Sequence, residues 1–221
     1  MIGDHQILVR VVPVRESEGG LWDLLDDAER ARVEQYRYED DRRRALVGRG
    51  MLRRLLGESL HRDPRELVFV TGQQGKPALA DGALEFNVSH AGDRVAIAIT
   101  RSTPVGIDVE LQTRRMHNLL TMARRFFSPV ESRVVEEAGD PAGAFFAIWT
   151  AKEAVIKAVG GGLAINLASF SVLPVEQELR DVQNLGGDPK LDGWTVAALP
   201  ADDGYRVAVS VRGPMGKIMQ R

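Results

Sequence analysis

The stretch Ile148-Trp149-Thr150-Ala151-Lys152-Glu153-Ala154-Val155-Ile156-Lys157 decides how the rest of the chain is interpreted. It predicts a helix over 144–159, because no Pro or Gly interrupts that range and three glycines follow it from Gly160. Apolar side chains recur along this range at helical spacing, so one face of the helix packs inward. The residues of that face are Phe145, Ile148, Trp149, Val155, Ile156 and Val159.

Charged residues lie within and beside this apolar face. Lys152 falls inside it, where an ordinary amphipathic helix would carry Leu, and Glu153 and Lys157 are one turn apart at its edge. An ion pair between Glu153 and Lys157 is the ordinary interpretation of that spacing. The alternative is a site in which the carboxylate serves a metal ion and the ammonium serves an anion.

The composition is that of a folded globular protein. The chain has 221 residues, 44% hydrophobic and 27% charged, with a formal net charge of -2, which argues against nucleic acid as its main ligand. It contains no cysteine, so disulfide and thiol chemistry are excluded. Because the first residues form no basic-then-apolar leader and no apolar run approaches the ~20 residues of a spanning helix, we expect a cytoplasmic protein without membrane contact.

A long helix, a short strand and a hairpin occur twice along the chain. This pattern predicts an α+β fold made of two similar halves, residues 1–104 and 105–221, related by a pseudo-two-fold and forming one compact unit, with a ligand cleft between them. In the first half we expect a strand over 6–14, helices over 22–38 and 40–60, a strand over 67–70, and a hairpin over 84–88 and 94–100. In the second half we expect a strand over 105–111, helices over 119–127 and 144–159, a strand over 169–174, and a hairpin over 194–199 and 205–212.

A second motif carries two carboxylates on one strand. In Val105-Gly106-Ile107-Asp108-Val109-Glu110, residues two apart point the same way, so Asp108 and Glu110 share one face. Two neighbouring carboxylates repel each other, and a cation between them relieves that repulsion. Oxygen ligands alone suit Mg²⁺ rather than zinc, and Glu153 supplies a third. Taken alone, the pair is also explained as a solvated strand edge.

Several residues are candidates for binding an anion. Lys157 lies one turn beyond Glu153, where it would meet a phosphate held on the metal. Gly75-Lys76-Pro77 offers backbone N–H groups and one cation in a tight turn. Ser89 and His90 are expected at a hairpin tip, and Arg44 belongs to a basic cluster at the start of the 40–60 helix. Each of these also has an ordinary explanation as a surface residue, so their joint occurrence is what counts.

Together these motifs resemble the 4′-phosphopantetheinyl transferase superfamily, and the surfactin-synthetase-activating (Sfp-like) type in particular. The two main motifs, 105–110 and 149–157, are similar to the paired signatures of that family. Weaker similarities lie at 75–77, 86–90 and 124–128, in the family's order, so that the resemblance spans about residues 44–170. This type is similar to two copies of a smaller subunit fused in one chain, which fits the doubled pattern.

The resemblance implies a reaction and a role for each motif. The phosphopantetheine arm of coenzyme A would move to a serine of an acyl or peptidyl carrier protein, releasing 3′,5′-ADP. By motif match, Asp108, Glu110 and Glu153 would hold Mg²⁺, and Lys157, less certainly Lys152, would contact the pyrophosphate. The 3′-phosphoadenosine end would be held by Arg44, Lys76, Ser89 and His90, with Gly75 and Pro77 shaping the loop and Arg42, Arg43 or Arg49 as alternatives to Arg44. Glu153, directly or through a water, would be the general base, and Glu131 is a weaker candidate.

The resemblance also implies a partner surface and leaves rival functions open. Carrier proteins of this kind are acidic near their serine, so a basic and apolar surface suits them. By resemblance, the chain length favours a monomeric protein. The resemblance also implies a role in fatty-acid, polyketide or nonribosomal peptide biosynthesis. One rival is an Mg²⁺-dependent nucleotide pyrophosphate hydrolase or transferase without a protein acceptor, and another is a catalytically silent coenzyme A-binding module. Candidate docking residues are Arg114, Arg115, Leu119, Met122, Arg124, Arg125 and Phe126.

Overall fold

The computed structural model describes residues 2–15, 19–72, 75–112, 118–160, 165–173 and 179–220. It divides into two compact units, one of Met1–Thr103 with Gly216–Arg221 and one of Pro104–Met215. The sequence analysis assigned all of 105–221 to the second half. In the structure Gly216–Arg221 groups with the first unit, because strand β12 (Lys217–Gln220) pairs with β1 (Gln6–Pro13).

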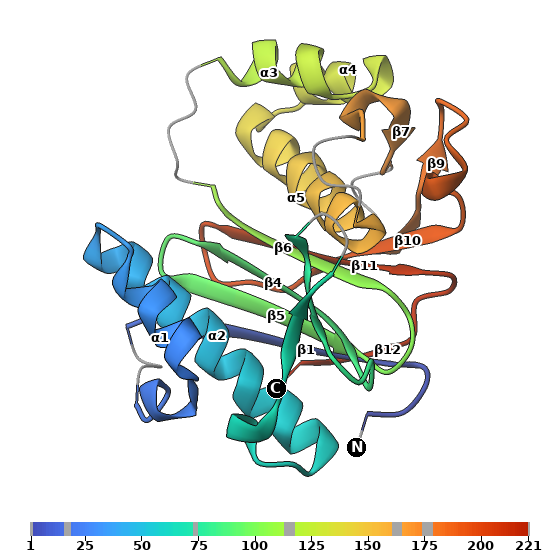
Figure 1. Ribbon diagram of the computed structural model, residues 1–221. Helices are drawn as coiled ribbons and strands as arrows, with labels where there is room; N and C mark the ends of the chain where they lie inside the picture. The colour runs from blue at the N-terminus through green and yellow to red at the C-terminus, as the bar shows by residue number, and fades with distance from the viewer. Residues whose placement is uncertain are drawn as a thin grey trace. The chain divides into compact units, whose positions relative to one another are not determined.

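The first unit is a four-stranded sheet with one long helix on it. The strand order is β12-β1-β5-β4, with β5 at Arg94–Thr100 and β4 at Glu85–Ala91. β12 runs parallel to β1, and the other neighbours are antiparallel. Helix α2 (Glu39–Leu60) packs against β5 and β4 (Figure 1). The smaller elements are η1 (Trp22–Leu24), α1 (Asp27–Glu34), η2 (Pro64–Glu66), β2 (Phe69–Thr71) and β3 (Pro77–Leu79).

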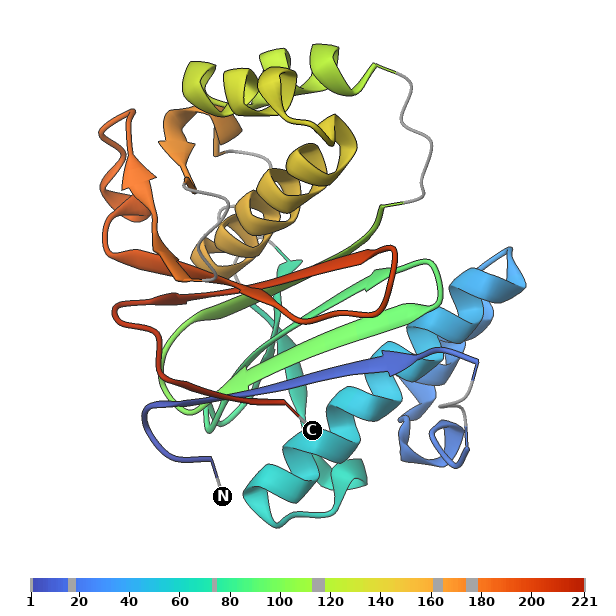
Figure 2. The ribbon, with the colours of Figure 1, turned by 180° about the vertical axis from the view of Figure 1, so that it is seen from behind.

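The second unit repeats this plan. Its sheet has the order β6-β11-β10-β8, all antiparallel, and helix α5 (Pro141–Val159) lies along β6, β11 and β10. Seen from behind, α5 crosses one face of its sheet, and two short helices pack against α5 on the side away from the sheet (Figure 2). The strands are β6 (Val105–Leu111), β8 (Leu179–Asp181), β10 (Trp194–Leu199) and β11 (Tyr205–Arg212); the short helices are α3 (Leu119–Phe126) and α4 (Pro129–Glu137); the remainder are η5 (Leu167–Ser169), β7 (Phe170–Ser171), β9 (Gln183–Asn184) and η6 (Pro189–Leu191).

The same topology therefore occurs in both units. A first strand is followed by a long helix and then by a hairpin whose second strand pairs with the first, giving β1-β5-β4 in one unit and β6-β11-β10 in the other. Each unit has its own cluster of buried apolar residues between helix and sheet. The predicted α+β class with two similar halves is confirmed. The cleft between the halves stays a prediction.

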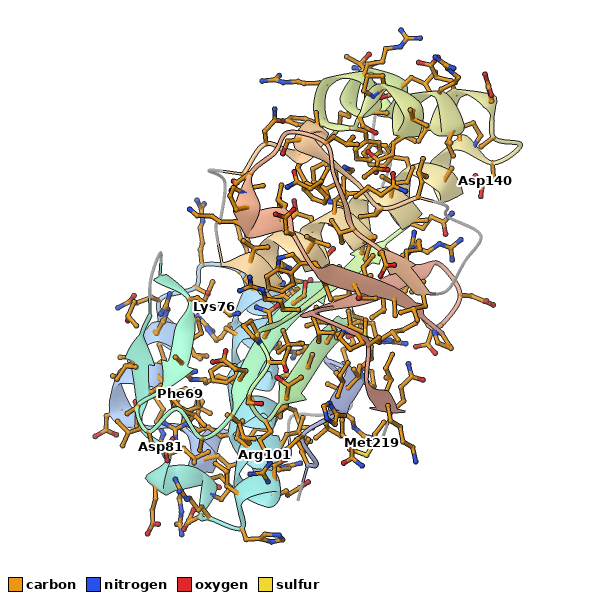
Figure 3. The ribbon with its side chains drawn as sticks, turned by 90° about the vertical axis from the view of Figure 1, so that its right-hand side faces the viewer. Phe69, Lys76, Asp81, Arg101, Asp140 and Met219 are labelled. Carbon is orange, nitrogen blue, oxygen red and sulfur yellow. The ribbon has the colours of Figure 1, made fainter. Side chains whose placement is uncertain are left out.

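Helix α5 ends where the sequence predicts and begins earlier. Gly160 adopts a left-handed conformation with φ of 73° and closes the helix through an N–H bond to the carbonyl of Ile156. At the other end Asp140, which is labelled in Figure 3, accepts a hydrogen bond from the N–H of Gly143. Pro141 occupies the first turn, where its missing N–H costs nothing. Gly161 and Gly162 lie outside the described residues.

Other predicted elements differ from the structure. The expected helix over 22–38 is two pieces, η1 and α1, because Asp26 caps α1 in a capping box. Of the strand expected over 169–174, the described residues 169–173 are extended as a strand only at Phe170–Ser171. Helix α4 was not predicted at all, although Ser128, Pro129 and Glu131 form a capping box with Pro in the first turn. None of the described helices has the length and apolar character of a membrane span.

Candidate active site

Strand β6 and helix α5 approach each other unusually closely at Gly106. A Cβ atom on Gly106 would lie 2.1 Å from the carbonyl oxygen of Ala154 and 2.4 Å from the backbone nitrogen of Ala158. Only glycine fits there without displacing the helix backbone. This close packing brings the polar edge of α5 within side-chain reach of Asp108 and Glu110.

Two contacts join the carboxylates of β6 to α5. The ammonium of Lys157 donates to Oδ1 of Asp108 at 2.7 Å, and the indole Nε1 of Trp149 donates to Oε1 of Glu110 at 3.1 Å. Because position 108 meets 157 and position 110 meets 149, strand and helix run in opposite directions. Asp108 is 3% exposed, and Glu110 is partly buried.

Glu153 lies between these two contacts along α5. Residues 149, 153 and 157 are spaced by four and are all partly buried, so they form one line on the helix surface. Burial raises the pKa of Glu153 above its ordinary value, the negative charge of Asp108 raises it further, and Lys157 lowers it. Asp108 and Glu153 thus lie close enough for the charge of one to change the pKa of the other.

The chemistry of this set fits a divalent cation. Asp108, Glu110 and Glu153 are oxygen donors with three negative charges against the single positive charge of Lys157. Burial is the larger cause of the raised pKa of Glu153, and the charge of Asp108 adds to it, so a cation here would relieve the repulsion between these two carboxylates. As they stand, the described residues include no group of three or more His, Cys, Asp or Glu side chains arranged to hold a metal ion. Lys157 and Trp149 engage two of the carboxylates instead.

Lys152 does not join this set. Its side chain is fully buried, with the ammonium 2.8 Å from Oε2 of Glu131 and donating to the carbonyls of Leu167 at 2.7 Å and Phe170 at 2.5 Å. These three acceptors use all three N–H donors of the ammonium. Desolvation lowers the pKa of Lys152, and Glu131 opposes that shift. The geometry therefore does not support the expected contact between Lys152 and pyrophosphate.

Glu131, the weaker candidate for the general base, is equally enclosed. It is 0% exposed and accepts hydrogen bonds from the Ser128 backbone and hydroxyl at 2.9 and 2.8 Å and from the Val172 N–H at 3.0 Å. Together with Lys152, these donors occupy both carboxylate oxygens. A carboxylate held in this way has no route to a substrate hydroxyl.

The arginine candidates on α2 divide into two groups. Arg44 donates to the carbonyl of Gly92 at 3.0 Å and to Asp41 at 2.6 Å while remaining partly exposed. Arg42 and Arg43 pair with Glu39. Arg49 instead turns inward, where it pairs with Glu29 and its guanidinium lies 3.7 Å from the centroid of the Phe69 ring. Among these four, the geometry favours Arg44 over Arg49 for contact with a ligand.

The turn around Lys76 has the expected shape. The Gly72 N–H donates to the Lys76 carbonyl at 2.7 Å, and Gly75 adopts φ of +82°, which favours glycine. Pro77 begins β3 and is exposed. Burial lowers the pKa of Lys76, with Glu85 opposing the shift. Figure 3 shows Lys76 in the first unit, in the region of the β2-β3 hairpin that also carries Phe69.

Ser89 and His90 are not at a hairpin tip. Both belong to β4, where they pair in register with Ala96 and Val95 of β5, and the turn itself is Gly92-Asp93. The turn lies later than predicted, because Ser89 and His90 continue the strand and Gly92 has the positive φ that the turn needs. Ser89 is buried and His90 exposed, so their side chains point to opposite sheet faces.

The predicted docking residues also divide by exposure. Leu119, Met122 and Phe126 pack against the core of the second unit, whereas Arg124 and Arg125 are exposed. Arg124 pairs with Glu136 at 2.6 Å. Arg114 and Arg115 lie outside the described residues. Of the predicted docking residues on α3, the basic ones are exposed and the apolar ones pack against the core.

Two features of the structure were not foreseen. Arg53 on α2 is 1% exposed and bridges four groups, although a basic residue in a helix suggests a surface position. A cavity of ≈ 380 Å³ lies in the second unit between the start of α5 and the sheet, with Arg180 and Arg206 among its lining. None of the predicted site residues lines it.

Comparison with known proteins identifies the family. A model described as 4′-phosphopantetheinyl transferase superfamily matches residues 104–210, and one described as 4′-phosphopantetheinyl transferase, N-terminal, matches residues 13–102. A 4′-phosphopantetheinyl transferase, HetI of Nostoc, is 33% identical over 222 residues, 96% of this chain and 90% of its own. The chain belongs to the 4′-phosphopantetheinyl transferase superfamily.

Further relatives agree with this placement in a family of transferases. A putative 4′-phosphopantetheinyl transferase of Synechocystis is 33% identical over 85% of this chain and 79% of its own length. The 4′-phosphopantetheinyl transferase Sfp of Bacillus subtilis is 29% identical over 86% of this chain and 84% of its own. The resemblance to the Sfp-like type is confirmed, and so is the prediction that the protein is a transferase.

Proposed function

We propose that this phosphopantetheinyl transferase moves the 4′-phosphopantetheine arm of coenzyme A to a serine of an acyl or peptidyl carrier protein, in a reaction that needs Mg²⁺. One observation carries the proposal. Asp108 and Glu110 on β6 face Glu153 and Lys157 on α5, in a chain of this family, with Lys157 2.7 Å from Asp108. That set supplies both oxygen ligands for a cation and an ammonium for an anion.

The proposed reaction balances without a further reagent. The serine oxygen attacks the β-phosphorus of coenzyme A, and the bond from that phosphorus to the bridging oxygen breaks, so that 3′,5′-ADP leaves. The serine proton must be accepted, and Glu153, directly or through a water, is the proposed base. Lys157 would neutralise charge that develops on the phosphoryl oxygens.

Asp108, Glu110 and Glu153 are the proposed ligands of Mg²⁺. When bound, the ion would offset the negative charge of the pyrophosphate and of the departing group. Lys157 now neutralises Asp108, and a divalent cation in its place would release the ammonium for the phosphates. Removal of divalent metal should therefore abolish transfer.

Arg44 and Lys76 are the proposed contacts of the nucleotide end of coenzyme A. Arg44 is partly exposed, and Lys76 stands on a turn of backbone N–H groups, so both suit the 3′-phosphate. Ser89 and His90 stay candidates from the family motif. Arg44→Ala should raise KM for coenzyme A more than KM for 3′-dephospho-coenzyme A. Arg49→Lys, at an inward-facing position, should change the two KM values by the same factor.

Arg124 and Arg125 are the proposed contacts for an acidic carrier protein. Both are exposed on α3, and attraction between unlike charges accelerates and orients docking. Reversing both charges to Glu should raise KM for the carrier and leave that for coenzyme A unchanged. Reversal of the exposed Arg133 on α4 is the matched control. The natural carrier, the pathway, the monomeric state and the cytoplasmic location stay predictions.

Mass measurement of a carrier protein tests the proposal. The protein is incubated with coenzyme A, Mg²⁺ and an apo-carrier, and the expected result is a carrier heavier by one phosphopantetheine group. Formation of 3′,5′-ADP with an unmodified carrier would indicate the hydrolase instead. Neither product would indicate a binding module. Asp108→Asn and Glu153→Gln are the controls, and both should be inactive while folded.

A further inference from the structure

Each unit of the protein contains one buried cation on its long helix. In the first unit Arg53 of α2 is 1% exposed, and in the second Lys152 of α5 is 0% exposed. Burying a charged side chain is costly unless its donors are satisfied. The partners of the two residues therefore show what each cation does.

The first partner is the same in both units. Arg53 Nε lies 2.6 Å from Oε2 of Glu29, and Lys152 Nζ lies 2.8 Å from Oε2 of Glu131. Each glutamate stands at the third position of the short helix that directly precedes the long one, and each closes a capping box there, with Asp26 or Ser128. One carboxylate thus caps a short helix and also binds the buried cation of the next helix.

The remaining partners match as well. Arg53 donates to the carbonyls of Pro64 at 2.7 Å and Leu67 at 3.1 Å, the first residue of η2 and the residue that follows its end. Lys152 donates to Leu167 and Phe170, which hold the same two positions around η5. Three successive elements are therefore tied to one cation in each unit. We name these clusters the Arg53 anchor and the Lys152 anchor.

The Lys152 anchor lies one residue away from Glu153. Successive residues of a helix are rotated by about 100°, so the direction of Lys152 sets the direction of Glu153. The anchor fixes α5 against α4 and the 167–172 segment, and the line of residues 149, 153 and 157 then faces β6. We propose that Lys152 and Glu131 are positioning residues, which set the rotation of α5 so that Glu153 and Lys157 meet Asp108 and Glu110.

Because the anchor occurs in both units, a positioning role for Lys152 is favoured over direct binding of a ligand by Lys152. The Arg53 anchor has the same geometry in a unit that contains none of the three carboxylates, so the device belongs to the fold. Side chains reach about 5–6 Å from a helix axis, so a 20° rotation of α5 would move the Glu153 carboxylate by about 2 Å. A misplacement of about 1 Å can slow an enzyme by ~10²-fold.

Trp149 provides a readout that needs neither metal nor turnover. Its indole N–H donates to Glu110 across the boundary between α5 and β6, so its ¹H-¹⁵N signal reports how α5 faces the strand. Lys152→Met, Glu131→Gln and the double variant are compared with the wild type. Glutamine keeps an oxygen acceptor for Val172, and the double variant leaves no buried charge alone, so it should fold even where Lys152→Met does not. Comparison with Trp149→Phe assigns the signal.

The expected result is a shifted or broadened Trp149 indole signal in each folded variant. Turnover per folded molecule should fall more than about tenfold, with little change in the Kd of coenzyme A, and the double variant should be no worse than the more severe single one. The matched control is Arg53→Met with Glu29→Gln, which removes the corresponding pair from the first unit. It should lower stability and leave the Trp149 signal unchanged.

Two outcomes would overturn the proposal. An unchanged Trp149 signal with wild-type turnover in the folded double variant would reduce the anchor to a contribution to stability. A large rise in the Kd of coenzyme A for Lys152→Met, but not for Glu131→Gln, would make Lys152 a ligand contact. The turnover readout rests on the proposed function and the indole readout does not. A wild-type protein without transferase activity would therefore contradict the function and still allow the indole signal to decide about positioning.

Discussion

The ammonium of Lys157 on α5 lies 2.7 Å from Oδ1 of Asp108 on β6, and Asp108 is almost wholly buried. A buried carboxylate is unfavourable without a positive neighbour. Lys157 therefore holds the metal-free site together, at the position where a cation would take over its role. Under the proposed function the lysine would have two states, one paired with Asp108 and one available to phosphate.

Lys157→Met should destabilise the metal-free protein and increase its response to Mg²⁺. The loss of a hydrogen bond to a charged group costs about 1.5–3 kcal/mol, and the freed carboxylates should bind the cation without competition. Denaturation with and without Mg²⁺ measures both effects. Lys190→Met, at an exposed position, is the control and should change neither. If Mg²⁺ raised the free energy of unfolding equally in the wild type and in Lys157→Met, the ion would not replace Lys157.

Glu153→Gln should change how stability depends on pH. The pKa of Glu153 is raised from an ordinary value of 4.5, so the folded protein holds a proton that the unfolded chain loses. Stability of the metal-free wild type therefore falls as pH rises from that ordinary value through the raised pKa. The Gln variant should not lose stability over this pH range. It should therefore be more stable than the wild type at neutral pH and no more stable in acid.

Unfolding free energies across pH, measured without metal, test this sign. Glu137→Gln, at an exposed position on α4, should follow the wild type. Turnover of Glu153→Gln should drop by orders of magnitude at every pH. A Gln variant that is less stable than wild type at neutral pH would contradict the electrostatic interpretation.

Gly106→Ala should separate β6 from α5. The added Cβ would meet backbone atoms of Ala154 and Ala158, which cannot rotate away. We expect a stability loss of about 1–3 kcal/mol and a loss of turnover, since Asp108 and Lys157 move apart. Gly139→Ala is the control, because nothing lies within 4 Å of its Cβ. Normal turnover in Gly106→Ala would show that the close approach is not needed for the site.

Trp149→Phe should weaken metal binding, because the neutral indole N–H does not compete with a cation for charge and fixes the direction of the Glu110 carboxylate. Phenylalanine retains the stacking on Phe145, whose ring centroid lies 5.8 Å away, and loses the hydrogen bond to the Glu110 carboxylate, worth about 1.5–3 kcal/mol. Titration with Mn²⁺ as a paramagnetic probe measures the affinity. Trp194→Phe also loses a buried indole hydrogen bond, to the Lys190 carbonyl at 2.7 Å, and should leave metal affinity unchanged. Equal losses in the two variants would assign the effect to general destabilisation.

Local patterns predicted the elements that carry the carboxylates. The bounds of β6 were found in full, and α5 was found from its apolar spacing and its glycine stop. A shared site for Asp108 and helix α5 was expected from motif order and family resemblance. The ion pair between Asp108 and Lys157 was not predicted, since it joins residues 49 positions apart. Periodicity alone contains no information about contacts at that separation.

The interior partners of charged residues were beyond prediction for the same reason. Lys152 was correctly placed on an inward face, but its acceptors come from α4 and from the segment after α5. Arg53 shows no local sign of burial, because its partners lie 11 to 27 positions away. Helix α4 was predictable from its capping box and was missed. Ser89 and His90 were misplaced because turn-forming residue types outweighed the regular alternation of β4.

The parallel pairing of β12 with β1 has a consequence for how the protein is made. Residues 217–220 complete the edge of the first sheet, yet the ribosome delivers them after the whole of the second unit. During synthesis the second unit can fold as a continuous segment. Until residues 217–220 are made, one edge of β1 has unpaired backbone groups that can pair with other nascent chains. Chaperone protection of the amino-terminal unit should matter most in the interval before those last residues emerge.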